Sequence, residues 1–187
     1  MKTKHLFILF IIVALVQAFI PVKMIYDSEI TEKNGTVFKF KTAPIDPNDP
    51  FRGKYVRLNY EMNSFATLDS SWVFDDAIYI TLTKDMEGFA AVENVSRTAP
   101  ADDKAYIAAK TTNYYAGNVH FDIGYDRYYM EENKAPEAEQ AYSKYSRDTL
   151  AKPAYALIAV RNGNAVLKDV IIDDMPIRDY VVRHRNK

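Results

Sequence analysis

Hydrophobic residues form an almost unbroken run from Leu6 to Ile20, and Gln17 is the one polar residue inside it. Fifteen helical residues span about 22 Å, and continuing the helix through Pro21 to Ile25 extends it to about 30 Å, the thickness of a membrane's hydrocarbon layer. The first ten residues of the run have no polar face, unlike a buried helix of a soluble protein. The pattern therefore predicts a transmembrane helix.

Two interpretations of this segment remain open. A cleaved signal peptide would have the basic start, with Lys2 and Lys4, the apolar middle and the small-residue exit that ends at Ala18. A signal anchor would stay uncleaved, and the apolar residues that continue after Ala18 favour this interpretation. We predict residues 1–26 as a signal anchor, with the N terminus in the cytoplasm and residues from about 27 onward outside it.

Beyond residue 35 the hydrophobic positions recur with period two, the pattern of half-buried strands. Three segments alternate in this way: 36–42 (TVFKFKT), 77–83 (AIYITLT) and 118–124 (NVHFDIG). Segments 154–160 and 165–172 alternate less, which is typical of strands with both faces covered. The Asn162-Gly163 pair between these two segments predicts a β-hairpin.

One segment outside the apolar run, 135–150, has helical spacing. Pro136 suits a first helical turn, and acidic side chains such as Glu137 and Glu139 are favourable at the N-terminal end of a helix. Small or aromatic residues recur at helical spacing along it: Ala138, Ala141, Tyr142 and Tyr145. We therefore predict a single α+β domain, mainly antiparallel β with one short helix, over residues 36–187, joined to the anchor by a tether at 27–35.

Composition narrows the function classes. The 187 residues carry a net charge of −1, and without Lys2, Lys4 and Lys23 the remainder has 21 basic and 25 acidic groups, so we expect no nucleic-acid partner. The absence of cysteine excludes disulfides, thiolate metal sites and a cysteine nucleophile. The three histidines lack metal-ligand spacing, and the sequence has no phosphate-binding loop, so we predict no metal and no cofactor.

The segment from Asp46 to Tyr60, DPNDPFRGKYVRLNY, combines a rigid turn with a strand. Its prolines fix backbone angles, and Gly53 permits a conformation or a close contact that a side chain would block. Side chains in the strand alternate between two faces, one with Val56, Leu58 and Tyr60 and the other with Tyr55, Arg57 and Asn59. We predict that the face with Leu58 is buried and that the face with Tyr55 points away from the main apolar row.

This segment resembles the signature of the GDYXXLXY family of membrane-anchored proteins. An acidic-proline turn leads there into Arg-Gly-Asp-Tyr, two variable residues, Leu, one variable residue and Tyr. The matching positions in this chain are Asp46, Arg52, Gly53, Tyr55, Leu58 and Tyr60. Lys54 stands where the family has aspartate, so we expect no catalytic carboxylate at that position.

A second segment, YDRYYMEENKAPEAE, is similar to another part of the family pattern. The matching residues are Arg127, Tyr128, Tyr129, Glu132 and Glu139. Glu131 replaces a proline of the family pattern and Asn133 replaces a glycine. The resemblance implies a single-pass protein of the bacterial inner membrane, with a periplasmic domain of unknown molecular activity that is frequently encoded beside, or joined to, multi-spanning membrane proteins.

We carry two functional hypotheses. The favoured one is a non-enzymatic accessory or protein-binding domain, which the membrane holds at high effective concentration near its partner, with Arg52 and Tyr55 as contact residues. The 14 tyrosines fit this hypothesis, because tyrosine suits recognition surfaces, although tyrosines also fill strand faces. The alternative is an envelope hydrolase of glycan or peptide that uses Glu132 or Glu139, but acids at a helix start are also explained by the helix dipole.

Overall fold

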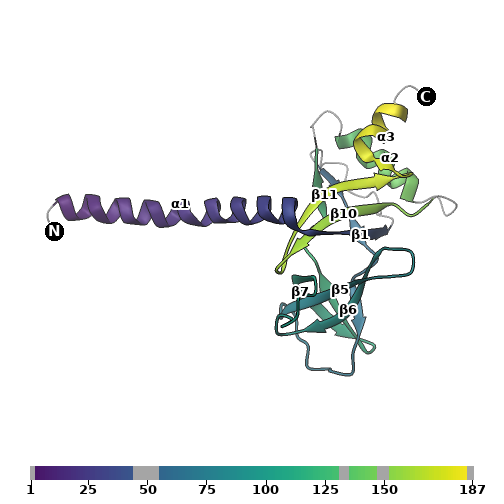
Figure 1. Cartoon of the computed structure of the whole chain (residues 1–187), viewed down its shortest axis with the longest axis horizontal. Helices are drawn as coiled ribbons and strands as arrows, with labels where there is room; N and C mark the ends of the chain where they lie inside the picture. Colours follow the sequence, from purple (N-terminus) through teal and green to yellow (C-terminus); the bar gives the residue numbers. More distant parts are fainter. Residues whose placement is uncertain (1–2, 44–54, 131–134, 147–151, 185–187) are drawn as a thin grey trace.

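The structure is a computed structural model, and it describes residues 3–43, 55–130, 135–146 and 152–184. Helix α1 (Thr3–Asn34) is the long apolar helix that the sequence predicts, and it projects from the β-rich part of the molecule as a rod (Figure 1). Residues 27–34, expected as a tether, are the last eight residues of this helix. One strand follows almost directly, because only Gly35 separates α1 from β1 (Thr36–Ala43).

The first five-stranded sheet contains the start and the end of the described chain. Its strand order is β12-β11-β10-β1-β3. The strands other than β1 are β3 (Asn59–Tyr60), β10 (Tyr155–Arg161), β11 (Asn164–Ile172) and β12 (Met175–Pro176). Arg161 pairs with Asn164, and the two residues between them both have positive φ angles, 50° at Asn162 and 81° at Gly163. This is the geometry of a type I′ turn, so the predicted Asn-Gly hairpin is confirmed.

The second five-stranded sheet has the order β4-β8-β7-β5-β6 and lies on the other side of β1 and β10 from the short helices (Figure 1). Its strands are β4 (Ser64–Ala66), β5 (Ala77–Lys84), β6 (Ala90–Ser96), β7 (Tyr106–Tyr115) and β8 (Asn118–Asp122). The two sheets meet at the β10–β11 hairpin, where the Ala108 amide donates to the Gly163 carbonyl at 2.9 Å.

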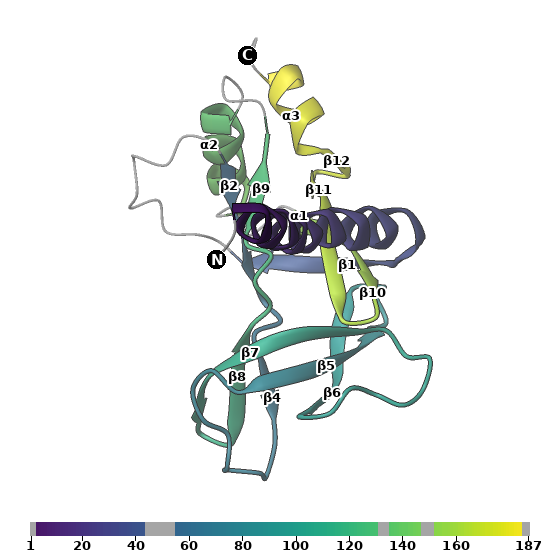
Figure 2. The ribbon, with the colours of Figure 1, turned by 90° about the vertical axis from the view of Figure 1, so that its left-hand side faces the viewer.

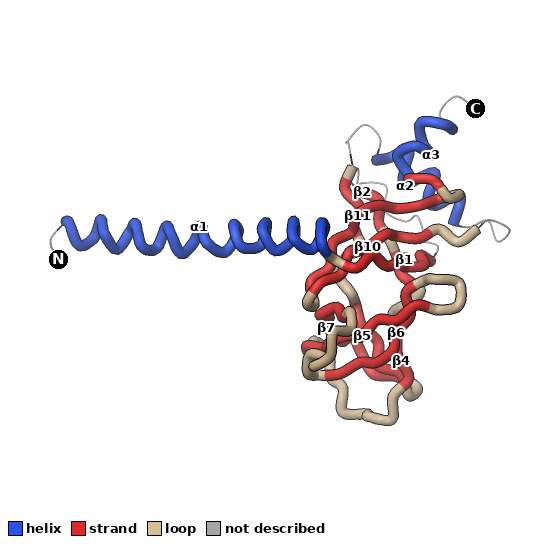
Figure 3. Tube along the Cα trace, viewed as in Figure 1, coloured by secondary structure: helices blue, strands red, loops and turns tan. Residues whose placement is uncertain are grey.

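A two-stranded ribbon of β2 (Tyr55–Arg57) and β9 (Arg127–Tyr129) completes the β structure of the described residues. Two short helices, α2 (Ala135–Ser146) and α3 (Ile177–His184), lie at the same end of the molecule as the ribbon (Figure 3). The predicted fold class, mainly antiparallel β with helices, is confirmed. Helix α3 is one short helix more than the sequence analysis anticipated.

The core confirms the period-two pattern. In each of the three alternating segments the apolar positions are buried: Phe38 and Phe40 in β1, Ile78, Ile80 and Leu82 in β5, and Val119, Phe121 and Ile123 at β8. These residues belong to one continuous cluster that also takes in both sheets, the ribbon and the short helices. The described residues beyond α1 therefore share a single hydrophobic core.

The junction between α1 and the first sheet is closely packed. Thr31, in the last turn of α1, is only 2% exposed, and its hydroxyl donates to the Asp27 carbonyl. A Cβ atom at Gly35 would lie 2.4 Å from the Thr31 carbonyl oxygen and 3.0 Å from that of Val160, so only glycine fits there. Lys168 of β11 donates to the Glu32 carbonyl at 3.1 Å, where the helix dipole favours a cation.

Candidate functional site

The two sequence segments that resembled the family pattern lie against each other. Strands β2 and β9 pair antiparallel, with Tyr55 opposite Tyr129, Val56 opposite Tyr128 and Arg57 opposite Arg127. Figure 2 shows the two strands side by side, next to α2. Beyond the paired residues, the Leu58 amide donates to the Asp126 carbonyl at 2.7 Å. Segments about seventy residues apart in the sequence therefore form one local structure.

The inward side of this ribbon is buried as the alternation predicts. Val56 is fully buried, and Leu58 and Tyr128 are 2% and 3% exposed. Helix α2 covers β2, and its Ala138 and Tyr142 belong to the same buried cluster. The apolar matching positions of the first motif thus anchor the ribbon to the core.

Tyr60, the last residue of the first motif, ties the two motif segments together. Its hydroxyl donates to the Tyr125 carbonyl at 2.5 Å, and its ring contacts Phe40 edge-on at 5.8 Å. Burial is the main reason that the pKa of Tyr60 is raised above its ordinary value. The hydroxyl therefore remains a hydrogen-bond donor at neutral pH, as the contact with the Tyr125 carbonyl requires.

Tyr128, of the second motif, joins β9 to β11 and α3. Its hydroxyl donates to Asp169 at 2.8 Å and accepts from the Arg178 Nε at 2.7 Å. Burial, followed by the hydrogen bond with Asp169, raises the pKa of Tyr128 to about 12. Asp169 and Arg178 could not be predicted from the sequence, because no local signal marks two charged residues that meet only through the side chain of a third.

The outward side of the ribbon carries Tyr55, Arg57, Arg127 and Tyr129, and we call these four residues the ribbon face. The rings of Tyr55 and Tyr129 lie 5.7 Å apart, and the Arg127 guanidinium lies 5.3 Å from the centre of the Tyr55 ring. Tyr129 is 64% exposed, and the side chains of Arg57 and Arg127 are more than half exposed. The ribbon face is thus an ordered aromatic and cationic surface in contact with solvent.

Charge on the ribbon face is only partly compensated. Asp126 lies 3.7 Å from both arginines, at Nε of Arg57 and Nε of Arg127. The pKa of Arg127 is raised, first by a side-chain hydrogen bond with Tyr129 and then by Tyr55 and Asp126. Among the described residues, two guanidinium groups therefore share one carboxylate, which leaves a local positive charge on this part of a domain that is acidic as a whole.

Several predicted site residues lie outside the described part of the chain. These are Asp46, Arg52, Gly53 and Glu132, and Lys54 belongs with them. Glu139, the other carboxylate proposed for hydrolysis, is a half-buried residue of α2. The hydrolase hypothesis, which uses Glu132 or Glu139, therefore stays a prediction that the described residues do not test.

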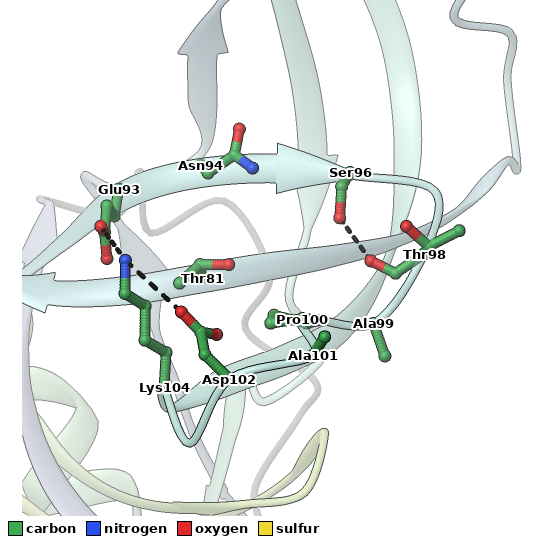
Figure 4. Close-up of a pocket in the computed structure, with 10 residues that line it drawn as sticks. All are labelled: Thr81, Glu93, Asn94, Ser96, Thr98, Ala99, Pro100, Ala101, Asp102 and Lys104. Carbon is green, nitrogen blue, oxygen red and sulfur yellow. Dashed lines mark hydrogen bonds and ion pairs between the residues drawn. The ribbon is translucent and has the colours of Figure 1, made fainter.

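A second surface feature is a depression of about 470 Å³ on the second sheet (Figure 4). Its charged lining side chains pair with one another, since Lys104 lies 2.5 Å from Glu93 and 3.8 Å from Asp102. Ser96, also in the lining, donates to the Thr98 carbonyl. Neither motif contributes to this depression, and the described residues contain no group of three His, Asp or Glu side chains that could hold a metal ion.

Comparison with known proteins supports the sequence resemblance. A family model described as GDYXXLXY protein matches residues 17–170, which is most of the chain and includes both motif segments. No curated protein and no solved structure is significantly similar to the chain.

Proposed function

Because the chain belongs to the GDYXXLXY family, and the two matching segments form one exposed ribbon, we propose that it is a membrane-anchored docking domain that binds a membrane protein through the ribbon face. The single observation that carries the proposal is the pairing of β2 with β9. The inward side chains of the two strands belong to the hydrophobic core. The outward side chains do not belong to it and are available to a partner.

The chemistry of the ribbon face suits protein recognition. Tyrosine and arginine are enriched where partners meet, because they bring a large contact area and hydrogen bonds with little loss of rotamer freedom. The Tyr55 and Tyr129 rings and the Arg127 guanidinium also order one another before any partner binds. Such preorganisation lowers the entropy cost of binding.

Membrane attachment supplies the other half of the proposal. We propose that α1 stays uncleaved and crosses the bacterial inner membrane once, with Lys2 and Lys4 at the cytoplasmic end. The eight residues from 27 to 34 then form a helical stalk of about 12 Å, which keeps the domain close to the lipid headgroups. A multi-spanning membrane protein with periplasmic loops fits this location.

Copurification from native-type membranes tests the proposal. We expect the full chain to retain a membrane protein in near-equal amount, and Tyr129→Ala to retain at least tenfold less of it. Tyr115→Ala is the matched control, because Tyr115 is also a strongly exposed tyrosine but lies at the end of β7 on the second sheet. Equal retention by the two variants, with both folded, would rule out the ribbon face as the interface.

A further inference from the structure

Gln17 is the polar residue of the apolar run, and it lies near the middle of the membrane span. A span of about 30 Å runs from Leu6 to Ile25, with Lys23 near its outer end paired to Asp27. Its midpoint falls between residues 15 and 16, so Gln17 is about 2 Å from the bilayer centre. This placement rests on the retained anchor of the proposed function. Water cannot satisfy an amide at that depth, so an unpaired Gln17 side chain is costly.

Pro21 leaves the main-chain carbonyl of Gln17 without its helical hydrogen bond. In an α-helix the amide of residue 21 would donate to the carbonyl of residue 17, and proline has no amide hydrogen. Gln17 therefore presents a side-chain amide and a main-chain carbonyl that lacks its helical donor. No residue of the apolar window of α1 is buried in the described chain and Gln17 itself is exposed, so no other described element covers either group.

The direction in which Gln17 points follows from the helical repeat. Thr31 comes 14 residues after Gln17, close to the 14.4 residues of about four turns, and α1 runs as one continuous rod through Pro21 (Figure 1). Gln17 and Thr31 thus lie on nearly the same face of α1. At Thr31 this face is covered by β10 and β11 of the first sheet. Gln17 therefore faces the membrane space that lies beneath the first sheet.

The position of the first sheet above Gln17 limits which transmembrane helix can pack against the Gln17 face of α1. A second copy of the chain would bring an α1 helix that continues straight beyond the membrane to Asn34. Packed at the usual helix separation of about 8–10 Å on the Gln17 face, that extension would run into β10 and β11. A helix that ends at the outer membrane surface has no such conflict.

We propose that Gln17, together with the free carbonyl beside Pro21, is a docking site inside the membrane for a transmembrane helix of another protein. That helix ends at the outer membrane surface beneath the first sheet and carries a hydrogen-bonding side chain near the bilayer centre. Ala14, one turn before Gln17, is small enough for two helices to approach closely there. The site would add a contact inside the membrane to the one that the ribbon face makes outside.

Photo-crosslinking in native-type membranes tests this site, with the full chain carrying a photoreactive residue at one position. Val13 lies on the Gln17 face and Leu15 on the opposite face. We expect position 13 to crosslink to a membrane-embedded segment of a different protein, identified by mass spectrometry of the adduct, and position 15 to crosslink to lipid. Gln17→Leu should lower the yield from position 13 about tenfold, whereas Phe19→Leu on the opposite face should leave it unchanged.

Three crosslinking results would overturn the inference. An adduct with twice the chain mass would make a second copy the occupant. An adduct to lipid alone from both positions would mean that no helix docks there, and an unchanged yield in Gln17→Leu would remove the amide from the contact. The intact mass of the purified chain separates these failures from failure of the proposed function. A mature chain that begins at Phe19 overturns both the retained anchor and this site, whereas loss of the crosslink in an intact chain overturns this site alone.

Discussion

At the scale of single residues, each of the two motif segments places some side chains in the core and others on the surface. Leu58 and Tyr128 are buried, and Tyr60 spans the two segments with its hydroxyl, whereas Tyr129 and Arg127 face solvent. The alternation of side chains in the first motif predicts this division for β2. It does not predict the partners of Tyr128, because Asp169 and Arg178 come from β11 and α3, far along the chain.

Leu58→Ala should lower the free energy of unfolding by about 2–5 kcal/mol, because it removes buried methyl groups from the core beneath the ribbon. Tyr129→Ala should lower it by less than about 1.5 kcal/mol, the worth of a partly exposed aromatic pair. Urea unfolding of the full chain in detergent measures both values. If both variants lost the same free energy of unfolding, the distinction between a buried inner side of the ribbon and an outer contact face would be contradicted.

Tyr128→Phe should lower the free energy of unfolding by about 1–3 kcal/mol at pH 8, because Asp169 and Arg178 lose their shared hydroxyl. The same variant should weaken the loss of stability at high pH. The pKa of Tyr128 is raised from 10.0 to about 12 in the folded state, so its stabilisation is complete below about pH 10 and is lost as the pH rises towards about 12.

Unfolding measured at pH 8 and at pH 11 tests this pH dependence. Tyr60, whose pKa is also raised, should account for a part of the decline that persists in Tyr128→Phe. An identical decline in the variant and the wild type would show that Tyr128 does not contribute to the high-pH loss.

At the scale of elements, the long alternating strands are predictable from the sequence and the short ones are not. Strands β1, β5 and β8 alternate over enough residues to give a clear period of two, whereas β2, β9 and β12 contain two or three residues each. A short strand is defined by its partner rather than by its own pattern. Helix α3 is equally short, at eight residues, and its packing against α2 depends on tertiary contacts such as that of Tyr180 with Tyr145.

The junction of α1 and β1 is an element-scale feature that the sequence did not indicate. Residues 27–34 are polar enough to suggest a tether, yet they continue the helix, because Thr31 is buried against the first sheet and Lys168 caps the last turn. Helix α1 and the first sheet are therefore joined directly through Gly35.

Gly35→Ala should loosen this junction. The added Cβ would lie 2.4 Å from the Thr31 carbonyl oxygen, a main-chain atom that cannot move aside easily, so we expect a loss of about 1–3 kcal/mol in the free energy of unfolding. Cleavage at the junction by a protease, with the chain in nanodiscs, should become faster. Lys33→Ala, an exposed change in the same turn, is the control, and unchanged cleavage in Gly35→Ala would show that the junction tolerates the side chain.

At the scale of the whole molecule, one apolar helix carries a β-rich domain in which two distant motifs meet. Hydropathy alone predicts the helix, and periodicity predicts the fold class. The meeting of β2 and β9 was not predictable from either pattern, since pairing between segments about seventy residues apart is set by the packing of the core beneath them. The resemblance nevertheless identified both segments as belonging to the same family pattern.

The ribbon face as a docking surface is best tested by the crosslinking yield from a photoreactive phenylalanine analogue at position 129, which keeps an aromatic ring next to Tyr55, in the full chain in native-type membranes. We predict a single major adduct with a membrane protein, and a yield from position 115 at least tenfold lower, because Tyr129 lies on the ribbon face and Tyr115 on the second sheet. Comparable yields from the two positions, or no protein adduct from position 129 in a chain that retains α1, would contradict the proposal that the paired motifs form a docking surface.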